Sequence, residues 1–440
     1  MAERTAGFHT LGCKVNRYET DAVMQRFVNA GYKVLGFDEV CDVYVINTCT
    51  VTGEAARKSG QFIRRARKLN PHAVVIAMGC QIQINGSSPQ ADIVLGTGDK
   101  TKAFEMAEEF ISGRNKKIAD ADSIDREAEC PEEYDEIGPV TSFDGSRAFV
   151  KIEDGCNRFC SYCIIPYARG RVRSRSSDQV LEEVRMLAMN GFKEVVLTGI
   201  DLSAFGSDKG KGIHSLAEIA EEIALIDGIK RIRLGSLEPY SMTEDFIRRL
   251  SVNEKICPHF HLSLQSGSDS VLKRMNREYD TCCFAEVVSS ITSCFRDVNI
   301  TVDLITGFPG ETDEEHQQTM DFSRKMDFMD MHIFKYSKRE GTKAAGMKEQ
   351  KLPEIVNERS RQLLELASEM KKAHLARHVG TYPEILAETL DGDKTEGYTA
   401  NYMHAVAHFT DENDRAKIKP GEIYPVHVIS SNNDSLLVKL

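Results

Sequence analysis

Three cysteines with the spacing C-x3-C-x2-C could hold an iron–sulfur cluster: Cys156, Cys160 and Cys163. Three thiolates ligate three irons of a cubane cluster, and no fourth cysteine follows nearby to close it. The fourth iron would then be open to a small molecule. A structural zinc loop is the alternative reading, but zinc prefers closed sites built from two pairs of ligands. No second C-x2-C or paired histidine completes such a site, so the spacing favours a cluster with one open iron.

A second set of cysteines recurs at equivalent positions of the N-terminal part: Cys13, Cys49 and Cys80. Each closely follows a short apolar segment that we predict as a strand, over residues 8–12, 43–47 and 73–78. In a parallel α/β sheet the loops after the strands converge at the carboxyl edge. One buried cysteine at a strand end is usually a packing residue, but three in equivalent positions are expected to meet. We therefore predict a second cluster with three protein ligands.

The elements that must position these cysteines can be predicted from the hydrophobic periodicity, which divides the chain into three parts. Residues 1–135 alternate strands with helices, for example at 16–27 and 52–69, and predict a flavodoxin-like parallel sheet domain. Residues 114–147 are rich in Asp, Glu and Lys and are predicted to be a linker, with Cys130 as an incidental thiol.

The central and C-terminal parts follow different patterns. Residues 145–375 predict an open (β/α)6 partial barrel, because they carry six strand–helix units rather than eight. Residues 376–440 show short alternating segments separated by turns and predict a small all-β, OB-like barrel of nucleic-acid-binding type. The six barrel strands are predicted at residues 148–152, 194–198, 231–234, 260–264, 301–305 and 332–336.

The fourth barrel strand has one polar face, formed by His259, His261, Ser263 and Gln265 at alternate positions. We expect this face to line the barrel interior and to hydrogen-bond a substrate or cofactor. A metal site at the two histidines is the less favoured alternative.

Composition narrows the class of protein. The chain has 440 residues, of which 28% are charged and 41% hydrophobic, as in ordinary globular proteins. No apolar run approaches the roughly 18 residues of a membrane span, and residues 1–4 lack the layout of a signal peptide. We therefore expect a cytoplasmic protein without a membrane partner. Its twelve cysteines are then more typical of metal binding or burial than of disulfides.

The formal net charge of −11 excludes indiscriminate nucleic-acid binding, so an RNA partner would need local basic patches. Alternating arginines in an extended segment would present one such edge to a phosphate backbone: Arg169, Arg171, Arg173 and Arg175. A solvated charged edge is the alternative. In the C-terminal module Tyr398 and Tyr402 could stack on bases, although aromatic residues of small barrels are more often core. That module is acidic, which departs from an RNA-binding surface.

Several motifs together resemble the radical SAM (S-adenosylmethionine) methylthiotransferases over essentially the whole chain. The motifs are LGCKVN at 11–16, NTC at 47–49, GC at 79–80, the C-x3-C-x2-C loop with Tyr162 before its last cysteine, LQSGS at 264–268, TGFPGET at 306–312 and GYTANY at 397–402. The last resembles the RNA-binding TRAM module of these enzymes. The GCKVN motif with Tyr18-Glu19-Thr20 resembles the branch that acts on N(6)-threonylcarbamoyladenosine of tRNA. Branches acting on isopentenyladenosine or on a ribosomal-protein aspartate are the alternatives, and a two-cluster electron-transfer protein is a more distant one.

The resemblance implies a transferase with two [4Fe–4S] clusters that adds a methylthio group to carbon 2 of the adenosine next to the anticodon. The cluster on Cys156, Cys160 and Cys163 would reduce one SAM to a radical source. The cluster on Cys13, Cys49 and Cys80 would hold a sulfur that a second SAM methylates. An electron donor such as flavodoxin or ferredoxin would be a further partner. Candidate SAM contacts, by strand-end position or by the resemblance, are Tyr162, Gly199, Ser236, Gln265 and Gly307.

Overall fold

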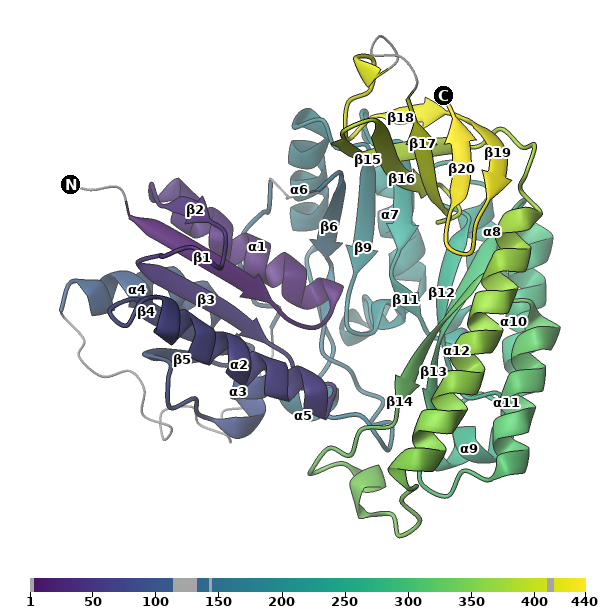
Figure 1. Ribbon diagram of the computed structural model, residues 1–440, viewed down its shortest axis with the longest axis horizontal. Helices are drawn as coiled ribbons and strands as arrows, with labels where there is room; N and C mark the ends of the chain where they lie inside the picture. The colour runs from purple at the N-terminus through teal and green to yellow at the C-terminus, as the bar shows by residue number, and fades with distance from the viewer. Residues whose placement is uncertain (1–3, 114–132, 142–144, 410–414) are drawn as a thin grey trace.

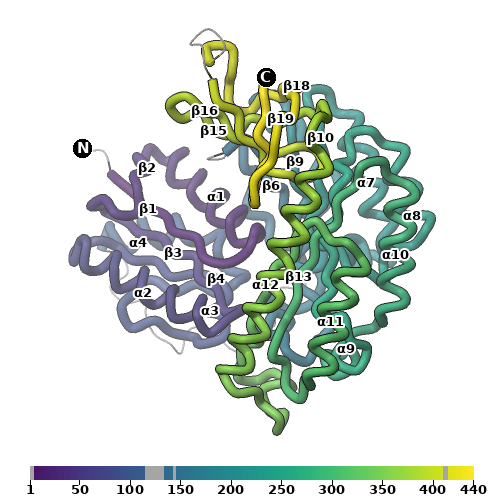
Figure 2. Tube along the Cα trace, turned by 45° about the vertical axis from the view of Figure 1, so that its right-hand side comes forward, coloured from purple at the N-terminus to yellow at the C-terminus, as the bar shows by residue number. Residues whose placement is uncertain are grey.

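The computed structural model describes residues 4–113, 133–141, 145–409 and 415–440 (Figure 1). Cys130, predicted to be an incidental thiol, lies outside the described residues. Two views show an N-terminal α/β domain beside a curved central wall of strands, with a small β-domain against one end of that wall (Figures 1 and 2). Within the described ranges, no helix is both long and apolar enough to cross a membrane.

The N-terminal domain is a five-stranded parallel sheet in the order β2-β1-β3-β4-β5. The inner strands β3 and β4 are buried along their whole length, as their continuous apolar sequences require. The order is that of flavodoxin-like sheets and confirms the predicted fold. The strands are β1 (Thr5–Thr10), β2 (Lys33–Leu35), β3 (Val43–Thr48), β4 (Val74–Gly79) and β5 (Ile93–Leu95). The helices are α1 (Lys14–Asn29), α2 (Gly53–Leu69), α3 (Cys80–Asn85) and α4 (Ala103–Ile111).

The central domain is an open barrel of six strand positions, as predicted. Its third strand is split at Gly235: β10 pairs with β9, and β11 pairs with β12, so two sheets form one curved wall. Each predicted strand overlaps a strand of the structure. The strands are β6 (Arg147–Lys151), β9 (Glu194–Thr198), β10 (Arg231–Leu234), β11 (Ser236–Leu237), β12 (His259–Gln265), β13 (Asn299–Thr306) and β14 (Asp330–Lys335).

Helices cover the outside of this wall and complete its core. The longest, α12 (Pro353–Ala376), starts at a proline, whose missing N–H costs nothing in the first turn of a helix. The others are α6 (Ser177–Met189), α7 (His214–Ala224), α8 (Glu244–Ser251), α10 (Thr281–Cys294) and α11 (Asp313–Met326). Short elements lie near the strand ends: β7 (Glu153–Asp154), α5 (Ile165–Arg169), β8 (Arg173–Ser174) and α9 (Asp269–Arg274).

The N-terminal domain covers the open side of the barrel between its first and last strands (Figure 1). On the β14 side, the Gly53 N–H donates to Ser337 Oγ at 2.9 Å, and Arg339 Nη2 donates to Thr50 Oγ1 at 2.7 Å. On the other side, Tyr18 of α1 donates to Glu183 of α6 at 3.0 Å. The barrel interior is therefore closed by a separate domain rather than by two further strands.

The C-terminal domain is a six-stranded sheet in the order β18-β15-β16-β17-β20-β19. Only Val426 separates β18 from β19, and the two pair with opposite edges, so the sheet curls on itself into the predicted small β-barrel. One strand pair, β17 with β20, is parallel. The strands are β15 (Glu384–Asp391), β16 (Lys394–Thr399), β17 (His404–His408), β18 (Ile423–Pro425), β19 (His427–Ser431) and β20 (Leu436–Lys439).

Tyr402 docks this domain on the barrel. Its ring stacks between His259 at the start of β12, with centroids 4.6 Å apart, and Tyr398, at 4.8 Å. The guanidinium groups of Arg147 and Arg233 lie 5.3 and 4.8 Å from the centroid of the Tyr402 ring. Tyr398 and Tyr402 were predicted to stack on RNA bases. In the structure their rings stack on each other, Tyr402 also stacks on His259, and Arg147 lies beside both tyrosine rings.

We expect Tyr402→Ala to weaken this docking. The substitution removes two ring stacks and two cation–π contacts, a loss of about 2–4 kcal/mol. Limited proteolysis should then cut the segment between α12 and β15 faster, and the thermal unfolding temperature should fall. Tyr382→Ala is the matched control, because Tyr382 is 77% exposed and stacks only on His427 of its own domain. Equal effects of the two substitutions would contradict the docking role.

Candidate active site

Cys13, Cys49 and Cys80 meet at the carboxyl edge of the N-terminal sheet, as their spacing predicted. Cys13 precedes α1, Cys49 follows β3, and Cys80 opens α3 directly after β4. Their sulfurs are close enough to influence each other electrostatically. The predicted first strand ends too late at Gly12, because Gly12 turns out of the sheet with φ +103°. A Cβ there would stand 2.9 Å from Cys49 Sγ, so only glycine allows this approach.

Cys156, Cys160 and Cys163 lie in the loop that follows β6 and β7, at the same end of the barrel as the carboxyl ends of the strands. The Cys156 N–H donates to the Gly170 carbonyl at 3.0 Å, and the Cys163 N–H donates to Cys160 O at 3.0 Å. Burial raises the pKa of Cys163 to about 12, and that of Cys49 in the other set to about 11. Such thiols are neutral when free and would release protons on binding a metal.

The spacing of the thiols fits clusters better than single ions. Zinc at about 2.3 Å from each sulfur would bring its ligand atoms within about 4.6 Å of one another. Neither cysteine set is that compact, and within the described residues the one histidine, cysteine and carboxylate group inside 4.8 Å contains no cysteine. A cubane cluster is larger and accommodates wider thiol spacing.

An arginine donates to one sulfur of each set. Arg169 Nε lies 3.2 Å from Cys80 Sγ, and Arg277 Nη1 lies 3.1 Å from Cys160 Sγ. A guanidinium is charged at all ordinary pH values and is a poor partner for a neutral thiol but a good one for a thiolate. The residues present therefore fit two iron–sulfur clusters. Sequence reasoning did not find Arg277, which no motif marks.

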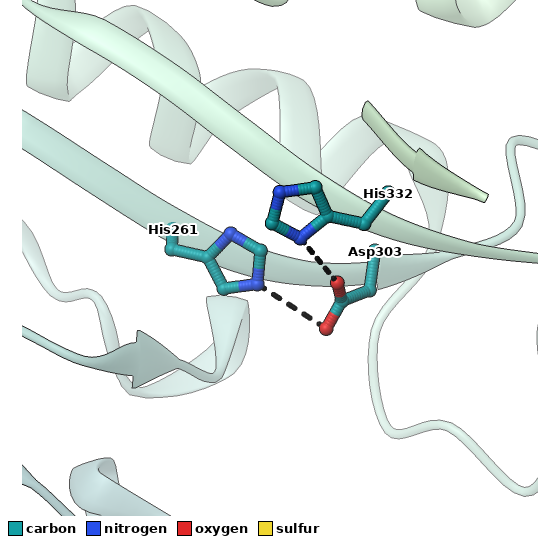
Figure 3. Close-up of side chains that lie close together, drawn as sticks. All are labelled: His261, Asp303 and His332. Atoms are coloured by element: carbon teal, nitrogen blue, oxygen red, sulfur yellow. Dashed lines mark ion pairs between the residues drawn. The ribbon is translucent and has the colours of Figure 1, made fainter. Parts of the chain in front are cut away.

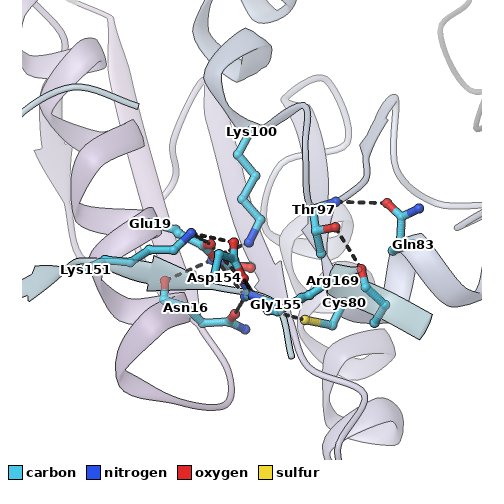
Figure 4. A network of polar contacts seen from close by, with 12 residues as sticks. Asn16, Glu19, Cys80, Gln83, Thr97, Lys100, Lys151, Asp154, Gly155 and Arg169 are labelled. Carbon is cyan, nitrogen blue, oxygen red and sulfur yellow. Dashed lines mark hydrogen bonds and ion pairs between the residues drawn. The ribbon is translucent and has the colours of Figure 1, made fainter. Parts of the chain in front are cut away.

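A buried charged network joins the two cysteine-bearing domains (Figure 4). Glu19 of α1 accepts from Arg169 Nη1 at 2.9 Å, from Lys151 Nζ at 2.8 Å and from Lys100. Asp154, next to the cysteine loop, accepts from Lys151 at 2.6 Å and Arg169 at 2.9 Å. Burial opposes the ionisation of Glu19, but the three cations together hold its pKa well below the usual value.

The arginine series is not the exposed edge that its alternation predicted. Arg169, Arg173 and Arg175 are buried, and only Arg171 is exposed. Arg175 pairs with Glu136 and Glu183, while Arg173 donates to two backbone carbonyls. The RNA-binding prediction is therefore wrong for these three, because their charges are used to join parts of the chain.

A cavity of about 220 Å³ lies between the two cysteine sets. The N-terminal domain contributes Val51 and Thr52 after Cys49, and the cysteine loop contributes Tyr162 and Cys163. Barrel residues complete the lining: Gln265, Asp303, Ile305, Phe334, Lys335 and Tyr336. Cys163 itself lines the cavity, and Val51 and Thr52, which closely follow Cys49, bring the loop of the other cysteine set to its wall.

Two of the five candidate SAM contacts line this cavity, Tyr162 and Gln265. Gln265 has φ +65°, a strained conformation for a residue other than glycine that is typical of functional sites. Gly199 instead makes room for Glu153, whose Oε2 would lie 2.6 Å from an added Cβ, and Gly307 makes room for Val356 of α12. Ser236 is exposed on β11 and does not line the cavity.

The polar face of β12 points inward, as predicted, and meets residues that sequence reasoning missed (Figure 3). His259 and His261 both hydrogen-bond Thr301 Oγ1, at 3.0 and 2.8 Å. His261 also faces Asp303 at 3.2 Å, and Asp303 faces His332 at 3.3 Å. Alternation along the predicted strands 301–305 and 332–336 could have placed Asp303 and His332 on the same inner face.

An open parallel barrel with three cysteines in the loop after its first strand, beside a cavity, defines the radical SAM class. The Radical SAM superfamily model matches residues 150–323, and the model described as uncharacterized protein family UPF0004 matches residues 5–96. A radical S-adenosylmethionine methyltransferase, TsrM, from Kitasatospora setae shares the fold, with a TM-score of 0.55 and 15% identity over 76% of this chain and 75% of that one.

Relatives of known function narrow the class of radical SAM enzyme to which this chain belongs. The threonylcarbamoyladenosine tRNA methylthiotransferase MtaB of Bacillus subtilis is 39% identical over 93% of this chain and 91% of its own length. The tRNA-2-methylthio-N(6)-dimethylallyladenosine synthase of Acetivibrio thermocellus is 35% identical over 86% of this chain and 80% of its own length. The chain belongs to the radical SAM tRNA methylthiotransferases.

We expect Glu19→Gln to destabilise the protein strongly. The substitution leaves Lys100 buried without its carboxylate partner and leaves Lys151 and Arg169 to share Asp154, at a cost of about 3–5 kcal/mol. Chemical denaturation under anaerobic conditions measures the loss. The double variant Glu19→Gln/Lys100→Met removes the stranded charge and should recover part of it. If Glu19→Gln behaves like the exposed-site control Arg171→Gln, the network is not a major source of stability.

Proposed function

We propose that this enzyme methylthiolates carbon 2 of N(6)-threonylcarbamoyladenosine next to the anticodon of tRNA. The observation that carries the proposal is a cavity lined both by Cys163 and by Val51 and Thr52, which closely follow Cys49 of the other cysteine set. The relative of the named threonylcarbamoyl branch, at 39% identity, supports this substrate over isopentenyladenosine, whose branch is represented at 35%. A ribosomal-protein aspartate and a two-cluster electron-transfer protein are the disfavoured alternatives.

The cofactors are SAM and two [4Fe–4S] clusters, which when bound supply a radical, a sulfur atom and a methyl group. Cys156, Cys160 and Cys163 would hold one cluster, and Cys13, Cys49 and Cys80 the other. Tyr162 and Gln265 border the space for SAM and the target base. Val51, Ile305 and Phe334 give that space an apolar lining, which would help to keep water away from a radical once the substrate fills it.

An electron donor such as flavodoxin or ferredoxin would reduce the enzyme in the cytoplasm. We assign residues 1–135 to the N-terminal domain, 145–375 to the radical SAM core and 376–440 to the TRAM module.

For contact with the tRNA backbone we favour the exposed basic residues of α2, because Thr52, the N-cap of this helix, borders the cavity. They include Arg57, Arg64 and Lys68, which are joined by the exposed Arg171.

The decisive experiment offers the reconstituted enzyme two anticodon stem-loops under anaerobic conditions with reductant and SAM. One carries threonylcarbamoyladenosine and the other isopentenyladenosine. We expect mass spectrometry to show a methylthio group gained only on the first. Gain only on the second would reassign the branch, and SAM cleavage without gain on either would point to another substrate.

Cysteine substitutions separate the two sets. Cys163→Ala should lower the iron content by about four per chain and abolish SAM cleavage. Cys80→Ala should lower it by the same amount, keep SAM cleavage and abolish methylthio transfer. The exposed Cys282 provides the control, because Cys282→Ala should change neither iron content nor activity. Loss of SAM cleavage in Cys80→Ala with iron still at the half-loaded level would contradict this division of roles.

A further inference from the structure

A row of polar side chains runs across three neighbouring barrel strands: His261 of β12, Asp303 of β13 and His332 of β14 (Figure 3). Asp303 and His332 are direct neighbours in the register of their strands. The carboxylate of Asp303 faces His261 Nε2 at 3.2 Å and His332 Nδ1 at 3.3 Å. Asp303 is the member of the row that lines the cavity.

His332 is the member of this row that can reach a ligand. Its side chain is 53% exposed, compared with 11% for His261. Because Nδ1 is engaged by Asp303, Nε2 is left as the ring atom for a further partner. The hydrogen bond with Asp303 raises the pKa of His332 and so favours its cationic form, in which Nε2 donates.

Lys14 brings a second positive charge from the N-terminal domain. It follows Cys13 directly, its side chain is exposed, and within the described residues its ammonium has no hydrogen bond or ion pair. Its electrostatic neighbours belong to the barrel and the C-terminal domain and include Asp303, Arg147, Arg233 and Tyr402. Both arginines are neutralised, Arg147 by Glu388 at 2.5 Å and Arg233 by Glu194 at 2.7 Å. Lys14 is not neutralised in this way.

The charges around His332 decide whether this row of side chains suits a cation or an anion. Two histidines and a carboxylate within 4.8 Å of one another could hold a divalent cation. A dication would, however, be repelled by Lys14, which lies in electrostatic range of His332. An anion would be attracted by Lys14 and could also accept a hydrogen bond from His332, while Asp303 keeps the His332 ring in place.

We propose that Lys14 and His332 bind the carboxylate of the threonyl group on N6 of the substrate adenosine, with Asp303 as a positioning residue. This inference rests on the proposed function and names the residues that read its distinguishing substituent. An isopentenyl group has no polar atom to offer, so on binding it would desolvate Lys14 and His332 without giving them partners. Sites built for polar groups reject apolar analogues strongly for this reason.

The test compares two stem-loops that differ only in the threonyl group, one with the natural carboxylate and one with the neutral carboxamide. Anaerobic binding titrations on the cluster-loaded enzyme give a Kd for each. We expect the wild type to prefer the carboxylate by about 10- to 100-fold, the usual range for hydrogen bonds to a charged group. Lys14→Gln and His332→Phe should each reduce that preference about 10-fold.

Because the preference is a ratio within one protein, it is insensitive to partial loading or stability loss. Lys33→Gln, on the exposed edge strand β2, is the control and should keep the wild-type ratio. Unchanged ratios in both the Lys14 and the His332 variant would overturn the inference while leaving the proposed function intact. A wild type that neither binds nor modifies either stem-loop would instead refute the proposed function. One equivalent of zinc or manganese per chain, lost in His332→Phe, would show that the row is a metal site.

Discussion

The arrangement of the active site depends on one buried cluster of charges between the N-terminal domain and the barrel. Three cations, Lys100, Lys151 and Arg169, surround two carboxylates, Glu19 and Asp154, and all five side chains are buried. Taking such charges out of water is costly unless each one is paired and hydrogen-bonded. The network is satisfied only when both domains are in place, because Glu19 and Lys100 come from one and Lys151, Asp154 and Arg169 from the other. It therefore specifies a single docking geometry.

The same network connects the two cysteine sets. Arg169 lies on the short helix after the C-x3-C-x2-C loop, it pairs with Asp154 just before that loop, and its Nε donates to Cys80 of the other domain. Arg173, whose Nη2 lies 3.7 Å from Asp154, adds a further cation, so the cluster has more cations than carboxylates, which suits a thiolate at Cys80. One guanidinium thus fixes the spacing between the two sets and supplies charge to one of them. The cavity between the sets follows from that spacing.

Much of the fold could be predicted because the responsible signals are local. Apolar runs followed by cysteines placed β1, β3 and β4 of the five N-terminal strands, and six strand–helix units predicted the open barrel with nearly correct strand positions. The cysteine sets followed from the rule that strand ends converge. The inner polar face of β12 followed from alternation alone, and His259 and His261 do lie inside.

What could not be predicted depends on contacts between distant segments. Alternation in residues 169–175 predicted an extended stretch of arginines, but Arg169 ends the helix α5. Nor could the pattern show that carboxylates from four other segments would pair with the three buried arginines. Gly199 and Gly307 sit at strand ends, as SAM contacts do, yet Glu153 and Val356 occupy the neighbouring space. A strand-end glycine looks the same in sequence whether a ligand or a side chain approaches it.

The C-terminal domain shows most clearly that the fold of a domain does not determine which function the domain has in a given protein. A small barrel with paired tyrosines suggests base stacking, but its composition is acidic and would repel a phosphate backbone. The structure resolves this conflict, because Tyr398 and Tyr402 serve docking and Asn401 joins the contact through Asn299, whose Nδ2 donates to Asn401 O at 2.9 Å. The domain thereby holds Tyr402 against His259 at the end of the barrel opposite the cysteines. A module that docks on the barrel in this way needs no positive surface, and the proposed contact with RNA therefore relies on the exposed basic residues of α2.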